Sequence, residues 1–117
     1  MRLNDSELRI LNVLWQEGDT TAKHISDVLK AEMGWNMNTT YTLIKRCIKK
    51  GFIERLEPYF MCHALITKKK VQKTVTNELI NKIYDGSIIN LFAVLLDEQG
   101  ITTEQFERLK QIVEELE

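Results

Sequence analysis

The chain has 117 residues, 44% of them hydrophobic and 28% charged, and its 16 basic and 17 acidic residues leave a formal net charge of −1. This length predicts one domain or two very small ones in a folded globular chain. The longest apolar run, Leu91–Leu96, is far shorter than the ~18 residues of a membrane-spanning helix, and residues 1–7 lack the apolar core of a secretion signal, so membrane insertion is not expected. Two cysteines are too few for a disulfide framework, so we expect a reduced, cytoplasmic chain.

The charge is unevenly distributed. Residues 1–70 contain 12 basic and 8 acidic side chains, whereas residues 71–117 contain 4 and 9. The stretch Met33–Ile53 contains no acid but holds the basic residues Lys45, Arg46, Lys49 and Lys50. Such a stretch is either an ordinary solvated helix face or a surface that binds an anion such as nucleic acid.

Three helices are predicted in the first 50 residues, over about 5–17, 22–33 and 37–50, each opened by a capping residue and closed by a glycine. The caps and stops are Asn4 (with Glu7 at capping-box spacing) and Gly18, Thr21 and Gly34, and Asn36 and Gly51.

The third of these helices has two chemically different faces at 100° per residue. One face is suited to burial and consists of Thr40, Leu43, Ile44, Cys47 and Ile48. The other is polar and basic and consists of Asn38, Thr42, Lys45, Arg46 and Lys49. Thr39 and Tyr41 lie near the borders, where contact with a partner and half-buried packing are both open.

Two short strands, Phe52–Leu56 and Tyr59–Leu65, follow with Glu57 and Pro58 as a tight link. Pro58 cannot donate to a strand ladder and is expected at the tip or an edge. Three further helices are predicted after Thr67, over about 88–96 after Ser87, and after Thr102, which forms a capping box with Gln105.

Three helices followed by a hairpin are the layout of a winged helix, with the second and third helices as the helix-turn-helix. We therefore expect a mainly α fold with a small β-hairpin: a winged-helix domain over 1–66 and a three-helix domain over 67–117. In this layout the third helix enters the DNA major groove, where asparagine and threonine suit base edges, arginine suits guanine or phosphate, and lysine suits phosphates. The predicted DNA-binding residues are Asn38, Thr39, Tyr41, Thr42, Lys45, Arg46, Lys49 and Lys50.

The C-terminal helices carry more apolar side chains than so small a segment can bury alone. Self-association into a two-fold dimer would cover them, and two third helices would then read two half-sites of a dyad-symmetric operator in double-stranded DNA. The alternative is that the helix over 88–96 packs within the monomer. The predicted dimerisation residues are Ile88, Ile89, Leu91, Phe92, Leu95, Leu96, Phe106, Leu109, Val113 and Leu116.

Several motifs along nearly the whole chain share an order and spacing with known proteins: Trp15 with Gly18, Thr21-Ala22, Gly34-Trp35, Asn38–Leu43, Arg46, Lys50–Ile53 and Ile80–Gly86. On these motifs the sequence resembles the penicillinase-repressor family, which includes methicillin-resistance and copper-responsive repressors. The resemblance implies a dimeric winged-helix repressor of a resistance operon. It also implies release through cleavage after a membrane-bound sensor protease responds to a β-lactam.

The sequence departs from that family in three places. The hairpin is short and has Glu57-Pro58 at its tip, where relatives often carry a longer basic wing. The chain has no cysteine-rich tail of the copper-responsive kind. Relatives of the penicillinase branch are cut between Asn and Phe, whereas the matching bond here joins Val94 and Leu95.

The remaining candidate groups predict no chemistry of their own. Cys47 and Cys62 are expected to be buried thiols, and no His or Cys spacing near His63 indicates zinc. His24 is expected on an exposed helix side, in reach of a phosphate. Because the sequence contains neither a phosphate loop nor a nucleophile elbow, we expect no cofactor and no enzyme activity. A winged-helix module that binds an acidic protein in place of DNA remains the alternative.

Overall fold

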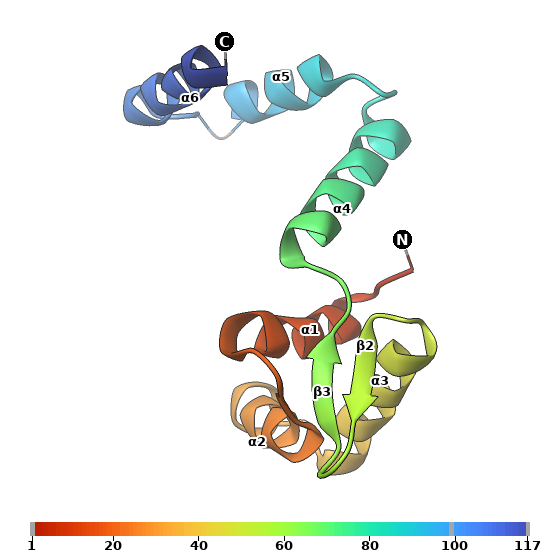
Figure 1. Ribbon diagram of the computed structural model, residues 1–117. Helices are drawn as coiled ribbons and strands as arrows, with labels where there is room; N and C mark the ends of the chain where they lie inside the picture. Colours follow the sequence, from red (N-terminus) through yellow and green to blue (C-terminus); the bar gives the residue numbers. More distant parts are fainter. Residues whose placement is uncertain (1, 99, 117) are drawn as a thin grey trace. The chain divides into compact units, whose positions relative to one another are not determined.

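The computed structural model describes residues 2–98 and 100–116 and has the predicted helices and hairpin strands in the predicted order, with one short strand added before the second helix (Figure 1). The side chain of Leu116 lies outside the described part. The mainly α winged-helix fold is confirmed. The elements are α1 (Asp5–Glu17), β1 (Thr20–Thr21), α2 (Ala22–Met33), α3 (Met37–Lys49), β2 (Ile53–Leu56), β3 (Met61–Ala64), α4 (Lys68–Ile83), α5 (Ile88–Glu98) and α6 (Thr103–Leu116).

Side-chain caps explain why the first three helices begin where they do. Asn4 and Glu7 form the predicted capping box, since each side chain accepts a hydrogen bond from the other residue's backbone N–H. Thr21 and Asn36 accept from backbone N–H groups in the first turns of α2 and α3. Gly34 ends α2 in the left-handed conformation, with a φ of 71°.

The sheet differs from the predicted hairpin in two ways. A third strand, β1, pairs antiparallel with β3, which lies between β1 and β2. The strands β2 and β3 are also shorter than predicted. β3 begins at Met61 and not at Tyr59, because Tyr59 and Phe60 have φ angles of 70° and 53° and cannot continue an extended strand. The link at the hairpin tip is therefore Glu57–Phe60.

The core lies between the sheet and the helices, with α1 and α3 packed behind β2 and β3 (Figure 1). It also contains side chains of α2, and its fully buried members include Ile10, Leu11, Ile25, Ile44 and Ile53. Trp15 donates its indole N–H to the carbonyl of Ile66 (2.9 Å), which holds the segment after β3 against α1.

Cys47 and Cys62 are buried free thiols in this core. Burial raises the pKa of Cys47 to about 12 and that of Cys62 to about 11, so both are protonated at neutral pH. No group of three or more His, Cys, Asp or Glu side chains within the described ranges could hold a metal ion.

The chain divides into two compact units, Met1–Val75 and Thr76–Glu117, and the division falls inside α4. In the second unit, many apolar side chains of α5 and α6 are exposed, including Ile89 at 72%. No single helix in the described part of the chain is long and apolar enough to cross a membrane, although α4 and α5 together, bent by 87°, reach the necessary length and composition.

Candidate nucleic-acid interface

The helix α3 turns one face into the core and leaves the opposite face in solvent. Thr40, Leu43, Ile44 and Cys47 are buried, which fixes the rotation of the helix about its axis. Tyr41, at the border, is half-buried. The predicted contact residues that are exposed are Asn38, Thr39, Thr42, Lys45, Arg46, Lys49 and Lys50.

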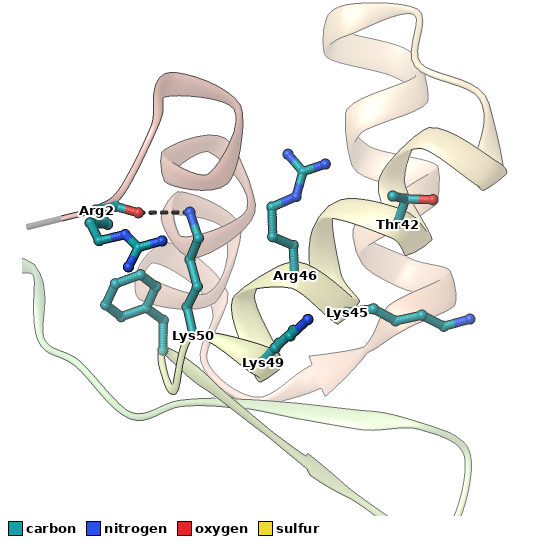
Figure 2. Close-up of a pocket in the computed structure, with 7 residues that line it drawn as sticks. Arg2, Thr42, Lys45, Arg46, Lys49 and Lys50 are labelled. Carbon is teal, nitrogen blue, oxygen red and sulfur yellow. Dashed lines mark hydrogen bonds between the residues drawn. The ribbon is translucent and has the colours of Figure 1, made fainter.

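Two hollows lie along this exposed face. The one toward the end of α3 is lined by Arg2, Thr42, Lys45, Arg46, Lys49, Lys50 and Phe52 (Figure 2). The other, toward its start, is lined by Ser6, Trp35, Asn36, Asn38, Thr39, Thr42, Leu43 and Arg46. Thr42 and Arg46 border both hollows, so hydrogen-bonding groups near the start of α3 continue directly into a strongly cationic surface near its end.

Lys50 has a different environment from the other predicted phosphate contacts. Its ammonium donates to the carbonyl of Arg2 (2.7 Å) and to Oε1 of Glu7 (2.8 Å). Glu7 is fully buried. Burial alone would raise the pKa of Glu7, but hydrogen bonds from the Asn4 backbone and from Lys50 outweigh it, so the pKa is lowered and the carboxylate is charged. Lys50 thus joins the end of α3 to α1.

Arg2 and Glu7 were not predicted as part of this surface. The capping role of Glu7 was readable from its spacing to Asn4, but its ion pair with Lys50 joins residues far apart in sequence. No motif or spacing around Arg2 in the sequence indicates that it lines the hollow at the end of α3.

Tyr41 connects α3 to the wing, which we define as β2, β3 and the link between them. Its ring meets that of Phe60 edge to face, with centroids 5.8 Å apart. The guanidinium of Arg55 lies 3.7 Å from the centroid of the Phe60 ring and pairs with Glu57. The structure therefore favours a packing role for Tyr41 and adds Arg55, which sequence reasoning missed, to the charged groups beside α3.

Each of the two histidines has a carboxylate partner. His24 Nε2 lies 2.8 Å from Glu17, and His63 Nδ1 lies 2.7 Å from Asp19. The hydrogen bond with Asp19, and the charge of that residue, raise the pKa of His63. His24, predicted on an exposed helix side, is half exposed and paired with Glu17.

A helix-turn-helix whose second helix shows a polar, cationic face to solvent, followed by a small antiparallel wing, defines the winged-helix class of DNA-binding proteins. A MarR family protein from Bacillus stearothermophilus has the same fold, with a TM-score of 0.52 and 17% identity over 99% of this chain and 74% of that protein.

A profile of the penicillinase repressor family matches residues 3–115, and the chain belongs to that family. The methicillin resistance regulatory protein MecI of Staphylococcus aureus is 25% identical over 113 residues, which cover 95% of this chain and 92% of MecI. The penicillinase repressor of Bacillus licheniformis is 22% identical over 116 residues, covering 97% and 91%. The chain is therefore a transcriptional repressor with DNA as its partner, and it is not an enzyme.

Proposed function

We propose that this repressor acts as a homodimer that reads a dyad-symmetric operator with the exposed face of α3. The observation that carries this proposal is the continuity of that face: hydrogen-bonding residues near its start lead through Thr42 into the cationic hollow near its end. In this arrangement the tip of α3 meets base edges while the cations behind it neutralise phosphates. The functional domains of the proposal are 1–66 for DNA binding and 67–117 for dimerisation.

Each exposed side chain of α3 has a role set by its chemistry. Asn38, Thr39 and Thr42 hydrogen-bond to base edges or nearby phosphates, and Arg46 forks onto a guanine edge or a phosphate. Lys45 and Lys49 contact phosphates as point charges. Tyr41 supports the helix through the wing, and Lys50 supports it through Glu7.

Variants of Arg46 and Lys49 distinguish sequence-specific from non-specific DNA binding. An operator selected from a random pool of duplexes serves as the target. Arg46→Ala is expected to weaken operator binding by about 1–3 kcal/mol and to relax preference at one base position. Lys49→Ala is expected to weaken binding to all duplexes alike and to reduce the salt slope by about one.

The control for both variants is Lys30→Ala, which removes an exposed charge from α2 outside both hollows. Wild-type operator affinity for Arg46→Ala at matched salt would contradict the assigned role. If the wild-type protein bound no duplex with steep salt dependence but captured an acidic protein, the protein-interaction alternative would replace DNA reading.

The dimer half of the proposal is supported by the apolar surface of α5 and α6. Most of the predicted dimerisation side chains are exposed: Ile88, Ile89, Phe92, Leu95, Leu96, Phe106, Leu109 and Val113, with Leu91 half-buried. An exposed apolar surface of this extent marks an association site. A second copy is the occupant we propose, because a two-fold dimer covers the same patch on both chains and presents two copies of α3 to one duplex.

The operon and the release step follow from the relatives. These relatives are named for methicillin resistance and penicillinase, so we infer a resistance operon of the β-lactam type. We propose that an inducing signal releases the repressor through a membrane-associated protease. Because the bond that matches the relatives' Asn–Phe cleavage site is Val94–Leu95, either that protease differs from theirs or cleavage is not the release step. Mass spectrometry of the chain from cells exposed to a β-lactam tests this step. An intact chain released from its operator would mean that cleavage is not the release step.

A further inference from the structure

The segment before α1 borders the cationic hollow at the end of α3. Arg2 is exposed and lines this hollow together with Arg46 and Lys49 (Figure 2). These three side chains come from two places far apart in the sequence. The fold therefore adds to the α3 face a cation that does not belong to the helix-turn-helix.

The position of Arg2 is fixed from within the protein. Lys50 donates one hydrogen bond to the Arg2 carbonyl and another to the buried carboxylate of Glu7. Glu7 also accepts from the backbone N–H of Asn4. The residues on both sides of Leu3 are thus attached to the same Lys50–Glu7 ion pair, which limits where the Arg2 guanidinium can reach.

The charge of the hollow is unbalanced. Lys50 is neutralised by Glu7, whereas the lining residues include no acid. Across the residues that the structure describes, no ion pair joins Arg2, Lys45, Arg46 or Lys49 to a carboxylate. Four like charges around one hollow repel one another, and a bound anion relieves that repulsion.

We propose that Arg2 binds a phosphate of the DNA backbone at the end of α3, and that the Lys50–Glu7 pair positions it there. This inference rests on the proposed function and extends the DNA interface beyond α3 and the wing. Arg2 and Lys49 line the hollow and hold the backbone, while Arg46, which borders both hollows, contacts the groove. Because a backbone contact is independent of base sequence, it can be measured on any duplex.

The first experiment measures fluorescence anisotropy of a labelled 30-base-pair duplex of mixed sequence, titrated at several salt concentrations. Arg2→Gln is expected to lower the slope of log affinity against log salt by about 0.9, the loss of one phosphate contact. At about 0.1 M salt this corresponds to a loss of about five- to tenfold in affinity. Arg9→Gln, which removes an exposed arginine of α1 outside the hollow, is the charge-matched control and is expected to leave the slope unchanged.

The second experiment tests the positioning role of the buried pair. Lys50→Met alone would leave a buried carboxylate without its partner, so it is combined with Glu7→Gln to keep the unit folded. In this double variant, Arg2→Gln is expected to produce less than half of its effect on the salt slope. Lys50→Arg, which retains the charge, is expected to keep the full effect of Arg2→Gln.

The outcomes separate this inference from the function on which it rests. If Arg46→Ala and Lys49→Ala weaken binding while Arg2→Gln leaves affinity and slope unchanged, Arg2 is not a phosphate contact and the inference is overturned. An equal effect of Arg2→Gln in both backgrounds overturns the positioning role. A wild-type protein without salt-dependent duplex binding overturns both the inference and the proposed function.

Discussion

The two units of the chain treat their apolar residues in opposite ways. In Met1–Val75 the isoleucines and leucines of α1, α2 and α3 are almost wholly buried around a small sheet. In Thr76–Glu117 the helix α5 is more apolar than any of these, yet Ile88, Ile89 and Leu96 are each more than half exposed. The first unit buries its apolar side chains in a folded core, whereas the second leaves many of its apolar side chains exposed to solvent.

This difference indicates where the free energy of each unit comes from. Burial in the first unit stabilises the monomer, at about 25 cal/mol for each Å² of apolar surface removed from water. In the proposed dimer the second unit gains a large part of this contribution on association, so its stability is expected to depend on protein concentration. Variants of the two units should therefore fail in different ways.

The largest expected effect is in the first core. Ile44, on the inner face of α3, is fully buried, and Ile44→Ala is expected to lower the free energy of unfolding by about 2–5 kcal/mol. Urea unfolding followed by tryptophan fluorescence measures this loss, which should be the same at every protein concentration. Lys30→Ala is the exposed control, with an expected change within about 0.5 kcal/mol. If this loss of unfolding free energy disappeared at high protein concentration, the stability of the first unit would depend on association and the proposed difference between the units would be wrong.

The next largest effect is in the second unit. Phe92→Glu combined with Leu95→Glu places two charges in the proposed dimer interface, and we expect a monomer with operator affinity reduced about 100-fold. Light scattering and operator titration measure the two consequences. The winged-helix unit should unfold with unchanged stability, which is the internal control. A dimer that persisted in this double variant would refute the proposed interface.

A smaller effect concerns pH and the buried pair of the first unit. The pKa of Glu7 is lowered from its ordinary value of 4.5, so its pairing stabilises the folded state fully above pH 4.5. That contribution is lost as pH falls through the lower folded pKa. Urea midpoints at pH 7, 4 and 3 should therefore fall more steeply for the wild-type chain than for Glu7→Gln. If the urea midpoints of the two proteins fell equally with pH, the ionisation of Glu7 would not contribute to the stability of the fold.

The smallest effect concerns the pair formed by His63, on the central strand β3, and Asp19, just before β1. The pKa of His63 is raised above its ordinary value of 6.5 by Asp19, so this exposed pair stabilises the fold below pH 6.5 and loses its effect as pH rises through the folded pKa. Titration of the His63 ring by NMR should give a pKa above 6.5. In Asp19→Asn it should return toward 6.5.

The sequence predicted the parts of this molecule that depend on local signals. The caps Asn4, Thr21 and Asn36 placed the helix starts correctly, because each acts on backbone groups within the same turn. The polar face of α3 was equally readable from periodicity, although its contact with DNA remains a prediction. The strand β1 was missed because two residues become a strand only through their partner β3.

Two features of the site were beyond local reasoning for the same reason. The left-handed φ angles of Tyr59 and Phe60 occur in residues that rarely adopt them, so no glycine signalled the wing turn. The Lys50–Glu7 pair joins the end of α3 to α1. The two residues are far apart in the sequence, and no local motif around either one indicates that they pair. Both depend on packing between distant segments.

The two buried thiols give the chain an intrinsic chemical reporter. Cys47 and Cys62 are the protein's only cysteines, and both belong to the winged-helix unit. A thiol reagent such as Ellman's reagent can reach them only when that unit opens, so the rate of colour development measures its opening without any engineered label. Separation of the two copies of the proposed dimer at α5 and α6 would expose neither thiol, so the reagent reports opening of the winged-helix unit and not dissociation.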